Sequence, residues 1–332
     1  MLMEEMGEEA LLIEVRRLFA SEGDDVILGI GDDAAVVDAP AATKLAWTTD
    51  MLVEGVHFQT GWQSAEELGR KSLMVNLSDL AAMASQPLYA LVSLAIEARM
   101  EAEYVLDLCR GIKSGCDEYG LRVIGGDTTA SGSGLIINIS AAGSVSGDAM
   151  ARSGAAPGEA IVVTGALGGA AAGMRLLAAG TGDAYPGLLR AFRSPEPRLA
   201  AAMAARDAGA TSMTDISDGL ATDLRHICAA SGVGATIDIA SLPHPPELDA
   251  ACREHGWDRE ALALGGGEDY ELLATFPAES VDGALKAIEQ RGDVRAAVIG
   301  QITADAGAIS VIAPDGHESA LKTRGFEHFR HD

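Results

Sequence analysis

The segment GDAMARSGAAPGEA, residues 147–160, decides how this chain is divided. It concentrates Gly, Pro and small residues between two apolar, β-branched runs, which is typical of a connection between domains. A chain of 332 residues also exceeds the usual size of a single hydrophobic core. We therefore expect two domains, an N-terminal one at 1–150 and a C-terminal one at 151–332.

Segments typical of strands and helices alternate on both sides of this connection. The expected strands are short β-branched or apolar runs bounded by Gly, Asp or Pro. They lie at 43–50, 90–96, 121–127, 135–145, 159–165, 234–242, 270–276 and 296–302. The expected helices carry apolar residues at spacings of three and four, and they lie at 64–84, 101–119, 169–180, 196–208, 218–231 and 278–291. This alternation predicts an α/β or α+β fold.

Composition and charge narrow the classes of function. Apolar residues make up 48% and charged residues 22%, as in ordinary globular proteins. The net charge of −25 argues against a nucleic-acid partner, because such binders need clustered Lys and Arg. We expect no membrane span, since no apolar run reaches about 18 residues, and the acidic start indicates an amphipathic helix rather than a secretory signal. The four cysteines show no CxxC or metal-finger spacing, which favours reduced thiols in a cytoplasmic protein.

Acidic residues recur where the predicted strands end or the predicted helices begin, beside Gly, Ser or Thr. Asp79 differs, because its spacing from Ser72, Val75 and Met83 places it on one inward face of a helix. The turn positions are Asp32 and Asp33 after Gly-Ile-Gly, Asp50 after Thr48 and Thr49, Asp127 after two glycines, Asp215 and Asp218 around Ser217, and Glu268 and Asp269 after three glycines.

Each acid alone has a structural explanation. Aspartate at a strand end is commonly a turn residue or helix cap, and Asp218 is a candidate cap for the helix that follows it. Asp79 could pair with Arg70 or Lys71. The full set is harder to explain in this way, because the chain has 49 acidic residues and only 24 basic ones, which are too few to pair with every acid.

Carboxylates that converge on one cleft require cations. Each pair repels by about 4 kcal/mol at roughly 4 Å for an effective dielectric constant near 20. Hard oxygen ligands without His or Cys select Mg²⁺ or Ca²⁺, and Mg²⁺ is typically bound by a few carboxylates together with substrate phosphates. If the acids converge, the sequence therefore indicates a site for a metal ion and a nucleotide.

Other familiar motifs are absent or incomplete. The segment TGALGGAAAG, residues 164–173, lacks the GK[ST] of a phosphate-binding loop and the spacing of a dinucleotide fingerprint. It favours close packing of a strand against a helix, with phosphate contact as the lesser alternative. No serine lies in a GxSxG elbow and no HExxH is present, which disfavours a hydrolase.

Taken in order, seven motifs resemble the thiamine-monophosphate kinase family. They are GIGDDAAVV, TTDMLVEGVHF, NLSDLAAMASQP, GGDTT, RSGAAPGE, DISDGL and GGGEDYEL, and they run from about residue 28 onward. The superfamily also holds aminoimidazole ribonucleotide synthetase, selenophosphate synthetase and a hydrogenase maturation factor. The resemblance implies a two-domain α/β (α+β) fold: an N-terminal mixed-sheet domain that pairs with a second subunit in a homodimer, and a C-terminal α/β domain.

For chemistry, the resemblance implies transfer of the ATP γ-phosphoryl group to thiamine monophosphate, giving thiamine diphosphate and ADP with several Mg²⁺ ions. No general base is expected, because a phosphate acceptor is already ionised near neutral pH. The family's magnesium ligands map onto Asp33, Thr48, Thr49, Asp50, Asp79, Asp127, Asp215 and Asp218. Its ATP contacts map onto Gly126, Asp127, Arg152 and Ser217, and its substrate contacts onto His57, Glu268 and Phe326.

The sequence departs from the family pattern at Ala84, where the family has glycine, and it leaves two alternatives. One is another ATP-dependent member of the superfamily similar to aminoimidazole ribonucleotide synthetase. Selenophosphate synthetase would carry a reactive Cys or selenocysteine near its start, and the maturation factor a cysteine in its tail, whereas the first cysteine here is Cys109 and the sequence ends GFEHFRHD. The other is a non-enzymatic divalent-cation-binding protein, although no EF-hand loop is present.

Overall fold

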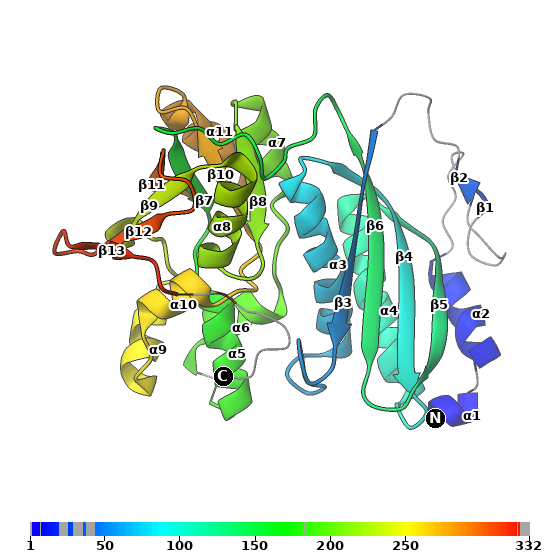
Figure 1. Ribbon diagram of the computed structural model, residues 1–332. Helices are drawn as coiled ribbons and strands as arrows, with labels where there is room; N and C mark the ends of the chain where they lie inside the picture. The colour runs from blue at the N-terminus through cyan, green and yellow to red at the C-terminus, as the bar shows by residue number, and fades with distance from the viewer. Residues whose placement is uncertain are drawn as a thin grey trace. The chain divides into compact units, whose positions relative to one another are not determined.

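The computed structural model describes residues 2–6, 8–19, 26–28, 36–37, 44–181, 184–323 and 325. The chain forms two compact units, which are described separately (Figure 1). The first unit comprises Met1–Leu80 and Ser85–Gly147, and the second comprises Ala81–Ala84 and Asp148–Asp332. None of the helices within the described ranges is long and apolar enough to cross a membrane.

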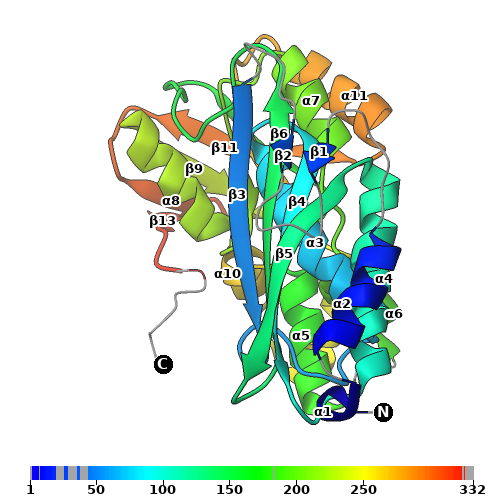
Figure 2. The ribbon, with the colours of Figure 1, turned by 90° about the vertical axis from the view of Figure 1, so that its right-hand side faces the viewer.

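The first unit is built on a mixed four-stranded sheet in the order β3-β6-β4-β5. β6 pairs antiparallel with both β3 and β4, and β4 pairs parallel with β5. Two long helices, α3 and α4, lie on one side of this sheet (Figure 2). The bounds are β3 (Lys44–Val53), α3 (Ala65–Ala82), β4 (Gln86–Glu97), α4 (Ala102–Tyr119), β5 (Arg122–Ser131) and β6 (Ile136–Val145), preceded by α1 (Met3–Met6), α2 (Glu8–Leu18), β1 (Val26–Leu28) and β2 (Val36–Val37).

Two glycines allow α3 and α4 to pack backbone against backbone. A Cβ atom on Gly69 would lie 1.9 Å from the Leu108 carbonyl oxygen, and one on Gly111 would lie 1.9 Å from that of Glu66. Such distances exclude any side chain, so both positions require glycine. The close contact helps to bury α3, which is almost wholly enclosed from Lys71 to Ala82.

α3 ends in a Schellman motif that explains the departure at Ala84. The Ser85 N–H donates to the Leu80 carbonyl, and the Ala84 N–H donates to the Ala81 carbonyl. Ala84 itself has a φ of +49°, the left-handed conformation that glycine adopts most easily. The chain therefore makes the turn with alanine, at a cost in backbone strain.

The second unit contains a seven-stranded mixed sheet in the order β13-β12-β9-β11-β7-β10-β8. Helices cover both of its faces: α8 and α10 pack on the face that carries Ile161 and Leu273, while α7 and α11 pack on the face of Val162 and Leu272. The bounds are β7 (Ala160–Thr164), α5 (Gly169–Ala179), α6 (Pro186–Arg193), α7 (Leu199–Asp207), β8 (Ser212–Ile216), α8 (Leu220–Ser231), β9 (Gly234–Asp238), α9 (Leu248–His255), α10 (Arg259–Gly265), β10 (Glu271–Phe276), α11 (Val281–Gly292), β11 (Ala296–Thr303), β12 (Ile309–Ile312) and β13 (Glu318–Ala320).

The predicted two-domain α/β fold class is confirmed, and each predicted strand and helix corresponds to an observed one. The strand expected at 234–242 ends early, at Asp238, because that carboxylate accepts the Ala240 N–H and begins a short 3₁₀ turn. β8 was not predicted from the sequence, because its Ser, Thr and Asp residues are typical of turns, although all five of its residues are buried. The other elements that were not predicted are β1, β2, α6, α9, α10, β12 and β13.

Candidate functional site

In the first unit, hydrogen bonds join α3 to β3 at the predicted metal ligands. The Thr48 hydroxyl donates to the Asp79 carboxylate on α3. Two residues further along β3, the Asp50 N–H donates to Asn76 Oδ1 at 3.1 Å. Asn76 is fully buried, and its amide nitrogen donates to the Ser72 carbonyl at 3.1 Å, which fixes its orientation. Thr48 and Asp50 therefore belong to the face of the sheet that α3 covers, and Asp79 on α3 lies against this face at Thr48.

Two further predicted ligands among the described residues of this unit, Thr49 and Asp127, belong to the opposite face. Thr49 alternates away from Thr48, and its hydroxyl accepts from Asn138 at 3.2 Å and Ser140 at 2.9 Å. Strand register places Asn138 beside Ser93, and Ser93 beside Asp127 on the edge strand β5. The sheet thus divides the ligands of this unit into two sets.

Gly126, a predicted ATP contact, has a structural role as well. A Cβ atom there would lie 1.8 Å from the Val92 carbonyl oxygen on β4. Glycine is therefore required for β4 and β5 to pair at this point, whether or not a nucleotide is bound.

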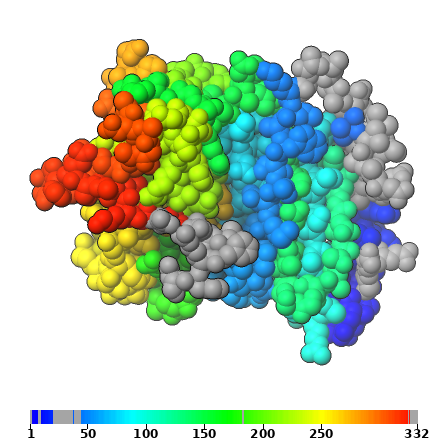
Figure 3. Space-filling model, viewed as in Figure 1, coloured from blue at the N-terminus to red at the C-terminus, as the bar shows by residue number. Residues whose placement is uncertain are grey.

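Large apolar side chains are exposed on the same face as Thr49. Trp47 and Met51 flank it on β3 and are 63% and 54% exposed, and Leu91 on β4 is also exposed. Figure 3 shows the β3 segment at the surface of its unit. An apolar strand surface of this kind is typical of an interaction face.

The loop after β3 holds His57 in a defined state. The Val53 N–H donates to His57 Nδ1 at 3.0 Å, so the proton of the neutral ring lies on Nε2. Glu54 fixes the loop by accepting the Thr60 hydroxyl, the Thr60 N–H and the Leu135 N–H. Burial raises the pKa of the Glu54 carboxyl, but these hydrogen bonds outweigh it and leave the pKa below its usual value.

In the second unit, acids crowd together where β8 meets α8. Asp215 is the penultimate residue of the buried strand, and Asp223 lies in the first turn of α8 with 1% of its surface exposed. Burial, followed by the charges of Asp215 and Asp218, raises the pKa of the Asp223 carboxyl to about 8, which Arg152 opposes. The Arg152 Nε atom donates to the Thr214 hydroxyl at 3.3 Å.

Asp223 was not identified from the sequence, and Asp218 does not cap α8. The N-cap is Gly219, which makes no side-chain cap hydrogen bond, and its own N–H donates back to Asp223 Oδ2 at 3.2 Å. An acid in the first turns of a helix is the only local signal for Asp223. Its proximity to Asp215 depends on how α8 packs against the sheet, which spacing does not reveal.

The segment 266–271 brings Glu268 beside Ser217. The Glu268 N–H donates to the Ser217 carbonyl at 2.8 Å, and the Tyr270 N–H donates to the Ile216 carbonyl at 2.9 Å. Glu268 and Tyr270 adopt left-handed φ values of +59° and +50°. This conformation costs a non-glycine residue about 1–2 kcal/mol, so the geometry here is held by its surroundings.

The glycine-rich turn before α5 is occupied by a carboxylate. Asp269 accepts the Gly168 N–H at 2.8 Å and the Ala170 N–H at 3.4 Å. A Cβ atom on Gly168 would also lie 2.9 Å from the Ala263 backbone nitrogen. These contacts favour close packing over phosphate binding at the TGALGG turn. Burial raises the pKa of the Asp269 carboxyl to about 7, although both N–H groups lower it.

A buried ion pair lies next to this segment. Glu271 is 4% exposed and accepts two hydrogen bonds from Arg198, at 2.7 Å from Nε and 2.6 Å from Nη2. The Thr164 hydroxyl donates to the same carboxylate at 2.6 Å. These three hydrogen bonds to the carboxylate are charge-assisted, and they stabilise the start of β10.

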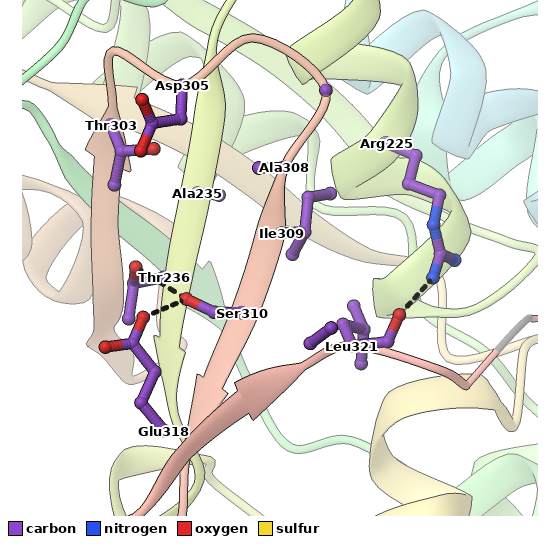
Figure 4. A pocket seen from close by; sticks show the side chains of 12 residues that line it. Arg225, Ala235, Thr236, Thr303, Asp305, Ala308, Ile309, Ser310, Glu318 and Leu321 are labelled. Atoms are coloured by element: carbon purple, nitrogen blue, oxygen red, sulfur yellow. Dashed lines mark hydrogen bonds between the residues drawn. The ribbon is translucent and has the colours of Figure 1, made fainter.

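Two predicted site residues, Asp33 and Phe326, lie outside the described residues, as does Asp32. Among the residues that the structure does describe, no three His, Cys, Asp or Glu side chains come together as a metal-binding group. A cavity of about 480 Å³ occurs elsewhere in the second unit, beside β9, β12 and β13 (Figure 4). Its lining includes Arg225, Thr236, Ser310 and Glu318, and none of the predicted site residues.

Comparisons with known proteins match both units. Residues 31–145 match the family model of the AIR synthase related protein, N-terminal domain, and residues 156–312 match that of the C-terminal domain. The thiamine-monophosphate kinase of Escherichia coli (strain K12) is 40% identical over 336 residues, covering 97% of this chain and 98% of its own.

Solved structures agree with this similarity. The thiamine-monophosphate kinase of Stenotrophomonas maltophilia K279a is 36% identical with a TM-score of 0.82, and the match covers 93% of this chain and 97% of that one. AaThiL complexed with AMPPCP and TMP is 31% identical with a TM-score of 0.77, and the match covers 99% of both chains.

Proposed function

The chain belongs to the thiamine-monophosphate kinase family, and we propose on this basis that it transfers the γ-phosphoryl group of ATP to thiamine monophosphate, giving thiamine diphosphate and ADP. The observation that carries the proposal is the 40% identity to a thiamine-monophosphate kinase across 97% of the chain. A relative solved with AMPPCP and TMP supports the same pair of substrates.

The side chains present fit Mg²⁺ as the metal. The candidate donors in the described ranges are carboxylates and hydroxyls, the hard oxygen ligands that Mg²⁺ prefers. Mg²⁺ usually takes one or two protein carboxylates and completes its shell with water and substrate phosphates, so pairs such as Asp50 and Asp79 suffice without a cage of three. The residues that would hold the ions are Asp33, Thr48, Thr49, Asp50, Asp79, Asp127, Asp215 and Asp218.

The electrostatics of the second unit support a bound cation. Burial contributes most to the raised pKa of the Asp223 carboxyl, and the charges of Asp215 and Asp218 raise this pKa further than Arg152 lowers it, so negative charge around Asp223 is in excess. Such a cluster takes up either protons or cations. Bound Mg²⁺ would neutralise charge on both phosphate groups, so that attacking and leaving oxygens could align.

The remaining predicted contacts bind and orient the substrates. Arg152 and Ser217 would bind the nucleotide with Gly126 and Asp127, since a guanidinium is suited to phosphate oxygens. His57 would donate from Nε2, because its Nδ1 already accepts the Val53 N–H. Glu268 would place a carboxylate near the cationic thiazolium, and Phe326 would complete this subsite. No residue needs to act as a base, because the acceptor phosphate is ionised.

We also place the protein in the cytoplasm as a homodimer. The exposed apolar side chains of β3 and β4, Trp47, Met51 and Leu91, support pairing of this sheet face with a second copy. Sedimentation would then give twice the mass of one chain. A monomer at micromolar concentration would contradict the pairing.

The test of the proposed function is a direct assay. Purified protein with ATP, Mg²⁺ and thiamine monophosphate should form thiamine diphosphate and ADP in equal amounts. EDTA should abolish both products, and thiamine should not replace its monophosphate. Formation of ADP without thiamine diphosphate would favour another ATP-dependent member of the superfamily. Cation binding without ADP formation would favour a non-enzymatic protein.

A further inference from the structure

The segment that joins α10 to β10 is held in a backbone conformation that its sequence disfavours. Gly267 has a φ of +69°, which costs glycine nothing. Glu268 and Tyr270 follow with φ values of +59° and +50°, where a side chain is strained. Asp269 lies between these two strained residues. Such torsions persist only where surrounding contacts enforce them, so the contacts of this segment must hold its conformation.

Backbone hydrogen bonds fix one side of the segment. The Glu268 N–H donates to the Ser217 carbonyl at 2.8 Å, and the Tyr270 N–H donates to the Ile216 carbonyl at 2.9 Å. These bonds align the segment with the end of β8. They do not involve Asp269, which lies between the two donors.

Asp269 fixes the other side. Its two carboxylate oxygens accept the Gly168 N–H at 2.8 Å and the Ala170 N–H at 3.4 Å, at the start of α5. The partial positive charge of the helix N-terminus favours a carboxylate at this point. The residue between the two strained positions is thus anchored to an element about 100 positions away in the sequence.

We propose that Asp269 is a positioning residue, which holds Glu268 in its left-handed conformation and thereby directs the Glu268 side chain in substrate binding. This inference rests on the proposed function, in which Glu268 contacts thiamine monophosphate. The direction of a Cα–Cβ bond follows from the backbone torsions, so relaxation of φ at Glu268 would redirect its carboxylate. Asp269 acts through Glu268 and touches no substrate.

The test is a double-mutant cycle on the KM for thiamine monophosphate. Glu268→Gln and Asp269→Asn should each raise this KM about tenfold and leave the KM for ATP within about twofold. Because Asp269 acts through Glu268, the double variant should be no worse than Glu268→Gln alone. Two effects that multiply, or an unchanged KM in Asp269→Asn, would overturn the proposal.

Asp258 provides a matched control. It is the N-cap of α10 and accepts the Glu260 N–H at 2.9 Å and the Ala261 N–H at 3.1 Å, as Asp269 accepts two N–H groups at the start of α5. Asp258→Asn should lower the melting temperature without changing the KM for thiamine monophosphate. An equal rise in KM for both variants would show general softening of the unit and would overturn the specific role of Asp269.

A second variant keeps the test decisive if Asp269→Asn does not fold. Asp269→Glu retains the carboxylate but is longer by one methylene, so it should displace the segment and raise the KM in the same direction. An unchanged KM in Asp269→Glu would contradict the proposal. Wild-type protein that forms no thiamine diphosphate would instead refute the proposed function, so the two failures are distinguishable.

Discussion

The two units position their acids in different ways. In the first unit, Asp50 and Asp79 lie on a strand and a helix, and hydrogen bonds between these regular elements set their places. In the second unit, Asp218 and Glu268 lie where the backbone leaves regular structure, and the strained torsions on either side of Asp269 are held by hydrogen bonds from this segment to its surroundings. Sites on regular elements are held by many contacts, whereas the loop site depends on a few anchors. Substitutions of acids in the first unit should therefore mainly lower turnover, whereas substitutions in the second unit should mainly displace side chains of the site.

The largest expected effect is the loss of turnover when an acid of the first unit is replaced. Asp50→Ala or Asp127→Ala should lower kcat by about a thousandfold, or about 4 kcal/mol, because each removes a carboxylate ligand of the proposed Mg²⁺. Thiamine diphosphate formation measures kcat, and circular dichroism should show an intact fold. The control is Asp117→Ala on α4, whose carboxylate pairs with Lys113 at the surface. Near-normal turnover in both site variants would refute the metal assignment.

The largest expected effect on stability lies in the second unit. Arg198→Ala leaves the buried Glu271 carboxylate without its charged partner, and should cost about 3–5 kcal/mol of unfolding free energy in urea titrations. Arg206→Ala removes an ion pair to Asp207 that is open to solvent, and should cost less than about 1 kcal/mol. Equal losses of unfolding free energy in the two variants would show that the Arg198–Glu271 pair contributes no more to stability than the Arg206–Asp207 pair at the surface.

The stability of the second unit should depend on pH through Asp269. The Asp269 pKa is about 7 in the folded chain, against about 4 when unfolded. Between these values the folded chain binds more protons, so the contribution of Asp269 to stability is complete below about pH 4 and is lost as pH rises to about 7. The loss is at most about 4 kcal/mol, from roughly three pH units at 1.36 kcal/mol each.

Urea titrations of wild type and Asp269→Asn from pH 4 to pH 8 measure this contribution. The stability of the wild type relative to the variant should fall up to about pH 7 and then stay constant. A difference that does not change with pH, or that grows, would contradict the raised pKa.

The smallest expected effect concerns the turn after α3. Ala84→Gly removes strain of about 1 kcal/mol at a φ of +49°, but also a buried methyl group that contributes about 0.8 kcal/mol, so stability should change by less than about 1 kcal/mol. Ala81→Gly, inside the helix, relieves no strain and should cost about 2 kcal/mol. Equal losses in thermal unfolding would show that Ala84 is not strained.

Local patterns predicted much of the fold and part of the site. The helical position of Asp79 and the strand position of Thr48 were each identified from the sequence, and the structure joins them by a hydrogen bond. The predicted strand end at Asp50 was wrong, because β3 continues to Val53. Alternation along β3 places Thr49 on the opposite face, but the placement of Asp127 on that same face was not predicted, because it depends on the order and register of strands in the sheet. The anchor of Asp269 was missed for a similar reason, since its partner Gly168 lies 101 positions away.

The first-unit carboxylates are proposed to hold divalent cations together with the nucleotide. This is tested most directly by counting bound Mn²⁺ with electron paramagnetic resonance, in the presence of AMPPCP, for wild type and Asp50→Asn. We predict that Asp50→Asn binds fewer Mn²⁺ ions per chain, or binds them at least tenfold more weakly. An unchanged number and affinity of Mn²⁺ ions would contradict the proposed role of these residues.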